Sequence, residues 1–152
     1  MAKFIYRMQN ILSLDEKLEE QAKMEYASQQ LAVNEASEME QSLKDRRASY
    51  EAEARRLREE TLSVRDIVAN NRAVEVMGDL ITAQHEVVLQ EEKKLEVKRA
   101  ALQEAMKDRK TQEKLKEKAF EEFKAELLME ESKEIDQLTS YTYGIKKTDG
   151  KE

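Results

Sequence analysis

Residues 110–144 of the 152-residue chain read KTQEKLKEKAFEEFKAELLMEESKEIDQLTSYTYG, and this stretch decides how the fold is interpreted. Most of its residues are strong helix formers, so it predicts one long helix that stops at Gly144. Although the stretch is very polar, it keeps large apolar side chains near its end: Phe120, Phe123, Leu127, Leu128, Ile135 and Leu138. Such side chains need a cover, which is the N-terminal segment of the chain, a second copy, or a groove on another protein.

The composition favours an all-α protein built from long helices. Charged residues make up 39% of the chain, Pro, Cys and Trp are absent, and only three Gly occur. A chain with so few turn residues cannot reverse often enough to assemble layers of short elements around a core. The absence of Cys also excludes disulfides, thiolate metal sites and a thiol nucleophile.

Charge and hydropathy limit the environments and the partners that fit the protein. No apolar run approaches the roughly 18 residues that a membrane span needs, so we expect a soluble protein. A net charge of -6 argues against nucleic acid as a partner, because binding to phosphates requires a cationic surface. Acidic neighbours dilute one basic run, which we interpret as a solvated face or a patch for a protein partner: Lys44, Arg46, Arg47, Arg55, Arg56 and Arg58.

The first arm, residues 3–60, repeats small or apolar residues on a seven-residue frame. One set of frame positions is Met8, Asp15, Ala22, Gln29, Ala36, Leu43, Tyr50 and Leu57, and a complementary set is Ile11, Leu18, Glu25, Ala32, Met39, Arg46 and Glu53. Because few of these side chains are large, pairing through this arm buries little apolar area and should be only modestly stable.

A break and a second arm follow. Ser63 and Asp66 have the spacing of a helix start, with a capping hydroxyl and then a negative charge in the first turn. We therefore place a reversal at about residues 60–64, with residues 70–72 as the alternative. The second arm, residues 65–143, carries the strongest periodic signal in the chain, a strict seven-residue repeat of Ile81, Val88, Leu95 and Leu102.

Folding the chain at this reversal aligns the frames of the two arms, so that Ala36 faces Val88. The prediction is a single antiparallel two-helix coiled-coil hairpin over residues 1–145. Its C-terminal helix is the longer one and continues past the end of the first arm. A disordered tail is expected at residues 146–152, which are small and charged.

Signatures of catalysis and of cofactor binding are missing from the sequence. The glycines, Gly78, Gly144 and Gly150, are isolated and cannot form a phosphate-binding loop. A single histidine, His85, excludes a two-histidine metal site, and we interpret it as a flank or partner contact. We therefore expect no catalytic residue, no metal and no cofactor.

Both ends of the chain resemble a known family. The opening FIYRMQNILSLDEKLEEQAKMEYA at residues 4–27, the motif LSVRDI at residues 62–67 and the closing residues 110–144 look like FliJ, a family of small coiled-coil proteins of the bacterial flagellar export apparatus. The resemblance implies an antiparallel two-helix coiled coil similar to the central stalk subunit of rotary ATPases. It also implies a non-enzymatic role in the cytoplasm, with attachment to the membrane only through partners.

The resemblance further implies three partners. The paired terminal ends bind the centre of the hexameric export ATPase FliI and promote its assembly or activity, the middle of the coil contacts the export gate FlhA, and export chaperones are bound in turn. We assign to the ATPase-binding end Phe4, Tyr6, Met8, Ile11, Phe120, Phe123, Leu127, Ile135 and Leu138, and to the gate Leu43, Tyr50 and His85. The seven-residue frame also places Leu43 and Tyr50 in the seam between the arms.

Two other functions fit the residues alone. One is a helical chaperone or adaptor that holds exported clients with its exposed end. The other is a purely structural coiled-coil spacer, which predicts self-association and no effect on an ATPase.

Overall fold

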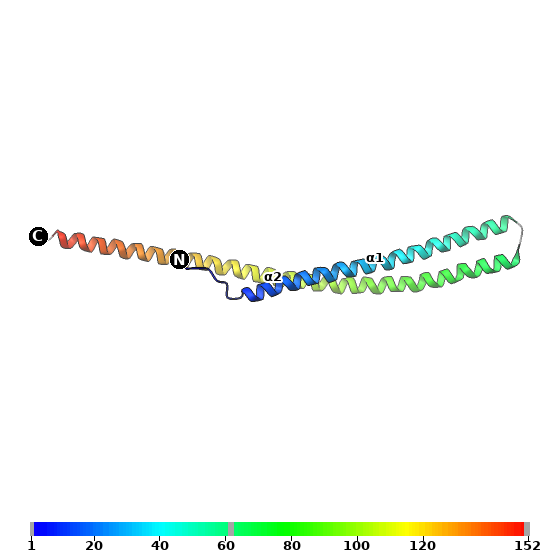
Figure 1. Ribbon diagram of the computed structural model, residues 1–152, viewed down its shortest axis with the longest axis horizontal. Coiled ribbons are helices and arrows are strands. Elements are labelled where there is room, and N and C mark those ends of the chain that lie inside the picture. The colour runs from blue at the N-terminus through cyan, green and yellow to red at the C-terminus, as the bar shows by residue number, and fades with distance from the viewer. Residues whose placement is uncertain (1, 61–62, 151–152) are drawn as a thin grey trace. The chain divides into compact units, whose positions relative to one another are not determined.

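The computed structural model describes residues 2–60 and 63–150, and their regular secondary structure is entirely α-helical. Helix α1 spans Gln9–Glu59 and helix α2 spans Val64–Asp149 (Figure 1). The described residues contain no strand, so the predicted all-α fold class is confirmed. Within these same residues, no helix has a stretch that is both long and apolar enough to cross a membrane.

The two helices are separated where the sequence predicts a reversal. Arg56 and Arg58 occupy the last turn of α1, where positive charge complements the partial negative charge of a helix end. At the start of α2 the Ser63 carbonyl accepts a hydrogen bond from the Ile67 backbone N–H at 3.1 Å, and Asp66 places negative charge in the first turn. Part of the predicted reversal, residues 61 and 62, lies outside the described residues.

Both outer ends of the helices differ from the prediction. The sequence predicts a helix from residue 3, whereas residues 2–6 are not helical and α1 begins only at Gln9. Helix α2 passes through Gly144, which keeps a negative φ and stays helical at a cost of about 1 kcal/mol relative to alanine. The predicted stop at Gly144 is therefore wrong, because α2 continues to Asp149. Residues 151 and 152 of the predicted disordered tail lie outside the described residues, and that the tail is disordered stays a prediction.

Contacts divide the chain into two compact units. Unit 1 comprises Met1–Leu18 and Met106–Glu152, and unit 2 comprises Glu19–Ala105. Each unit contains one segment of α1 and one of α2. That residues 1–145 form a single hairpin domain stays a prediction.

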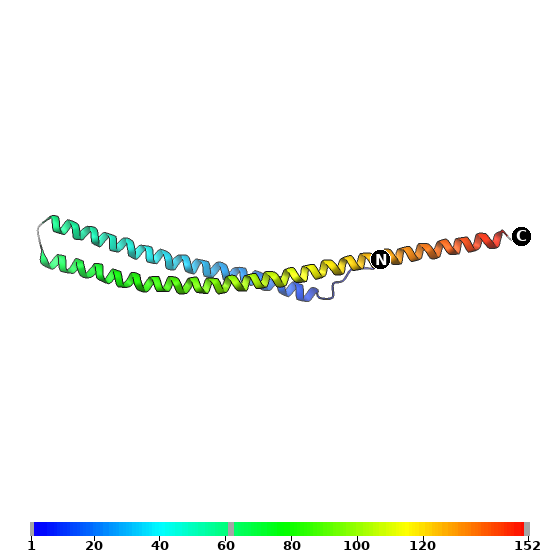
Figure 2. The ribbon, with the colours of Figure 1, turned by 180° about the vertical axis from the view of Figure 1, so that it is seen from behind.

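In unit 2 the segments of α1 and α2 lie side by side and run in opposite directions (Figures 1 and 2). Three amide side chains each donate a hydrogen bond to a backbone carbonyl of the other helix, at 3.0 Å in every case: Gln29 to Glu91, Gln84 to Ala36, and Asn70 to Tyr50. Residue numbers in these pairs rise along α1 as they fall along α2. This order is compatible with the predicted hairpin.

These three contacts, which we call the amide rungs, repeat at multiples of seven residues on both helices. A hydrogen bond requires one particular donor to lie close to one particular acceptor, so each rung specifies how far one helix is shifted along the other. An apolar contact is less directional and tolerates such a shift. The observed alignment differs little from the predicted one. Gln84 bonds to Ala36 and lies one helical turn from Val88, the residue that the aligned frames place opposite Ala36.

The core of unit 2 is small and partly polar. Its buried apolar residues are Val33, Ala36, Val88 and Leu95, and the buried polar residues beside them are Glu19, Glu40 and Asn70. The seven-residue repeat predicted for α2 is confirmed. Two of its members, Val88 and Leu95, are buried, and the other two, Ile81 and Leu102, are half-buried. Such a core removes little apolar surface from water, which is why directional polar contacts matter to its alignment.

One of the two stripes predicted for α1 is displaced by one residue. Leu18 and Met39 are 46% and 55% exposed, whereas the glutamates that follow them, Glu19 and Glu40, are 4% and 9% exposed. Each buried carboxylate forms an ion pair with the lysine four residues later on α1. These pairs compensate the cost of burying a charge, so an acidic residue occupies a position that the sequence pattern gives to an apolar one.

Removing one amide rung should lower the thermal unfolding midpoint. Gln84→Ala deletes a cross-helix hydrogen bond worth about 1 kcal/mol, while Gln90→Ala makes the same change of helix propensity at an exposed position of α2. We expect circular dichroism melts to show a midpoint about 2–4 °C lower for Gln84→Ala than for Gln90→Ala. Identical midpoints for the two variants would show that the rung does not stabilise unit 2.

Candidate functional site

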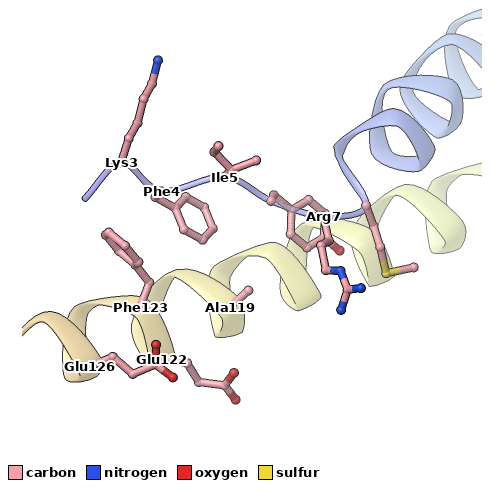
Figure 3. A pocket seen from close by; sticks show the side chains of 10 residues that line it. Lys3, Phe4, Ile5, Arg7, Ala119, Glu122, Phe123 and Glu126 are labelled. Carbon is pink, nitrogen blue, oxygen red and sulfur yellow. The ribbon is translucent and has the colours of Figure 1, made fainter. Parts of the chain in front are cut away.

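Residues 2–6, here called the strap, form an extended segment that lies along α2 within unit 1 (Figure 3). The Phe4 ring is directed at α2, while Lys3 and Ile5 point away from it. Ile5 is 79% exposed and Tyr6 only 9%. This alternation is the period of two of an extended backbone, so alternate side chains of the strap face α2.

The Phe4 ring packs against two phenylalanines of α2. Its centroid lies 5.1 Å from that of Phe120, in an edge-on arrangement, and 5.5 Å from that of Phe123, in a tilted one. Phe120 and Phe123 are three residues apart and therefore share one face of the helix. Such ring contacts contribute roughly 0.5–1.5 kcal/mol each beyond the burial of their area. Ahead of Tyr6, the strap is thus held to α2 mainly through the Phe4 ring.

Polar contacts fix the junction between the strap and α1. The Tyr6 hydroxyl donates to Gln112 Oε1 at 3.0 Å, and Lys116 Nζ donates to Gln9 Oε1 at 2.8 Å. Leu12, in the first turns of α1, is 3% exposed. These contacts place the start of α1 firmly against α2 and leave the strap as the less strongly attached part of this end.

Apolar side chains recur on the face of α2 that carries the rings. They form two groups, Phe120, Phe123 and Leu127, then Leu138, Tyr141 and Ile145, which share one face at helical spacing and which together we call the apolar row. Between the two groups this face carries Glu130, Glu131 and Glu134. Every described side chain of α2 from residue 128 onward is exposed. Leu138 is 66% and Tyr141 is 70% exposed. The described residues of unit 1 therefore leave the far half of the row uncovered.

The structure gathers five of the nine residues predicted for the ATPase-binding end. Phe4 contacts Phe120 and Phe123, and Tyr6 and Met8 line one pocket with Phe4 and Phe123. The other four lie apart from this cluster: Ile11 on the N-terminal side, 44% exposed, and Leu127, Ile135 and Leu138 farther along α2. That these nine residues bind an ATPase stays a prediction.

Sequence reasoning missed two features of this end. Ile145 extends the exposed apolar surface, because α2 continues past the glycine at which the prediction ended it. Gln112 carries no apolar signal, so nothing in the pattern indicates that it receives the Tyr6 hydroxyl.

The three residues predicted for the gate have different neighbours. Leu43 and Tyr50 are half-buried at the interface of unit 2, and the Tyr50 carbonyl accepts the Asn70 rung. The side chain of His85 is 58% exposed and contacts Glu40 across the helices. The structure therefore gives Leu43 and Tyr50 a packing role, and their part in gate binding stays a prediction.

Charge is concentrated around Glu40 at this interface. His85 Nδ1 lies 3.0 Å from Glu40 Oε1, and Lys44 Nζ lies 3.4 Å from the same oxygen. Burial raises the pKa of the Glu40 carboxyl, but the hydrogen bonds and charges of His85 and Lys44 outweigh burial and hold the pKa below its usual range. The ionised Glu40 carboxylate thus contacts Lys44 on its own helix, α1, and His85 on α2.

The described residues offer no cluster of His, Asp or Glu that would hold a metal ion. The features that remain are the apolar row, the strap that covers part of it, and the polar interface of unit 2. These are surfaces for contact with another macromolecule.

Comparison with known proteins assigns the chain to a class. The sequence profile described as flagellar FliJ protein matches residues 4–148. The chain therefore belongs to the FliJ family, a non-catalytic family of flagellar protein export and flagellum biogenesis. Neither the curated proteins nor the solved structures contain a match to it.

Neutralising Glu40 should weaken the dependence of stability on acid. Because the folded-state pKa of Glu40 is depressed, its contribution is complete above the ordinary glutamate value of roughly 4.3 and is lost as the pH falls through the lower, folded-state value. Glu40→Gln should lose less thermal stability than the wild type on acidification through this range. Circular dichroism melts at several pH values measure this loss.

Glu38→Gln is the matched control, because Glu38 is exposed two residues away on the same helix. If Glu40→Gln and Glu38→Gln lose stability in parallel with the wild type, the Glu40 ion pairs do not contribute.

Proposed function

We propose that the chain folds as an antiparallel coiled-coil hairpin whose unit 1 binds the centre of the ring of the export ATPase FliI and promotes the assembly or activity of that ring. A surface of unit 2 contacts the export gate FlhA, so the protein links the ATPase to the gate. It works in the cytoplasm and reaches the membrane only through these partners. Export chaperones are further partners.

The uncovered half of the apolar row carries this proposal. A helix that exposes Leu138 and Tyr141 to water gains from a groove, since burying one large apolar side chain contributes about 1.5–3 kcal/mol. Side chains at helical spacing on one face are the anchors with which an amphipathic helix enters an apolar groove or channel. Membership of an export family makes a component of the export machinery the partner to test first.

The charge of the side chains around the apolar row indicates which residues should line the edges of the partner groove. Between Phe120 and Gln137 the chain carries seven acidic residues and two lysines. An acidic helix with an apolar face is complementary to an apolar groove lined at its edges by Lys and Arg. The same charge disfavours docking on an acidic surface. The partner surface that we expect on the ATPase is therefore apolar at its centre and basic at its rim.

Support for the gate contact comes from the surroundings of Tyr50. Tyr50 and Asn70 line a shallow pocket with Asp66, and the Asn70 side chain is buried. Its Oδ1 atom has no hydrogen-bond partner among the described residues. The polar side chains that line this pocket offer hydrogen-bonding groups to a partner.

Placing a charge in the uncovered half of the row tests the ATPase contact. Leu138→Asp introduces a carboxylate where the partner groove is apolar, and Val97→Asp introduces the same change in unit 2 at a side chain of equal exposure, 67% against 66%. We expect Leu138→Asp to weaken binding to the purified export ATPase at least about tenfold and Val97→Asp to leave it unchanged. Titration calorimetry measures both affinities.

Wild-type affinity in both variants would contradict ring binding through the row. The same outcome, combined with self-association of the wild type in light scattering, would favour a structural spacer.

A further inference from the structure

The strap and the apolar row compete for the same face of α2. Phe4 packs on Phe120 and Phe123, and Ala2 lines a groove with Leu127 and with acidic residues of the next turns of α2. These three α2 residues are the near half of the row. Unit 1 therefore divides the row into a half that the strap covers and a half that is exposed.

Beyond its buried residue Tyr6, which is hydrogen-bonded to Gln112, the strap resembles a removable cover more than a part of the core. Its residues make no helix, and its side chains Lys3 and Ile5 point into solvent (Figure 3). Phe120 remains 40% exposed beneath it, and the pocket between strap and helix has a volume of about 380 Å³. Residues 2–5 are held to α2 mainly by the Phe4 ring, so they separate from the helix far more easily than two packed helices do, while Tyr6 stays in place.

Residues of opposite charge line the pocket beside the strap. Arg7, which directly follows the strap, lines it together with Glu122 and Glu126 of α2. The strap thus presents an aromatic ring to an apolar, acidic helix, with a basic residue directly after it. These are the same properties that the proposed partner groove requires, so the strap is a built-in substitute for the partner.

From this arrangement we propose that the strap is an autoinhibitory cover, which occupies the Phe120, Phe123 and Leu127 half of the apolar row and must leave before the export ATPase engages the full row. This inference rests on the proposed function for the identity of the partner. The free energy of strap docking is subtracted from that of partner binding, so the closed protein binds more weakly than the open one.

Phe4→Ala opens the strap, and Ile5→Ala is the matched control because Ile5 belongs to the same segment but is 79% exposed. Binding of an apolar fluorescent dye should rise in Phe4→Ala alone, since Phe120 and Phe123 lose their cover. Affinity for the purified export ATPase should rise about threefold or more in Phe4→Ala and stay at the wild-type level in Ile5→Ala. Weaker ATPase binding by Phe4→Ala would overturn the proposal, because Phe4 would then be a partner contact.

A locked strap provides the opposite test. The chain contains no Cys, so Ala2→Cys combined with Glu131→Cys gives one defined pair of thiols, and both positions line the same groove. Joining them with a cleavable bis-maleimide keeps all rings of the row intact. We expect the locked protein to bind the ATPase about tenfold more weakly than the same protein after cleavage of the linker. Equal affinity before and after cleavage would overturn the proposal.

The two failures are distinguishable. If the wild type binds the ATPase and Leu138→Asp does not, while strap opening and locking change nothing, only the autoinhibitory role is wrong. If no variant binds the ATPase, the proposed function is wrong, and with it the partner that the strap is inferred to exclude.

Discussion

Hydrogen bonds from amide side chains to backbone carbonyls of the opposite helix are the constraint on which unit 2 depends. A core with only a few buried apolar side chains cannot by itself fix how far one helix slides along the other. The rungs of Gln29, Gln84 and Asn70 supply that alignment at intervals of whole heptads. Glu19 and Glu40 are also part of this polar interface. Each forms an ion pair with a lysine, which compensates the cost of burying its charge between the helices. Unit 2 is therefore specified by polar geometry as much as by apolar burial.

Unit 1 follows the opposite principle. Its aromatic cluster is apolar, and its segment of α2 continues with large apolar side chains that are exposed. In a protein that is so strongly charged, retaining Leu138 and Tyr141 at exposed positions is a cost in solubility, and a partner that covers them accounts for it. The division between a self-sufficient polar interface and an incomplete apolar one is the physical basis for assigning partner binding to unit 1.

The sequence predicts well those features that depend on regular spacing, and poorly those that depend on compensation between particular side chains. The repeat through Val88 and Leu95 locates the buried face of α2, because apolar residues at seven-residue intervals have few other uses. The buried face of α1 is harder to find, since Glu19 and Glu40 appear as surface residues until their lysine partners are placed. Glycine has a low helix propensity, and on that ground alone the sequence predicts that the helix stops at Gly144. In the structure Gly144 remains helical. At the site, the sequence indicates Phe4, Phe120 and Phe123 as candidate contact residues. It leaves open whether the N-terminal segment covers α2, and only the structure shows that the three rings pack together.

The central claim is that the apolar row of α2, and not the helical surface in general, meets the export ATPase. The most direct measurement places the photoreactive amino acid p-benzoylphenylalanine at Tyr141, which is 70% exposed in the row, and in a second protein at Met24, which is 69% exposed in unit 2. After irradiation with the purified export ATPase, a cross-linked band from the Tyr141 protein and none from the Met24 protein is the predicted result. Cross-linking of equal strength from both positions, or from Met24 alone, would contradict the account.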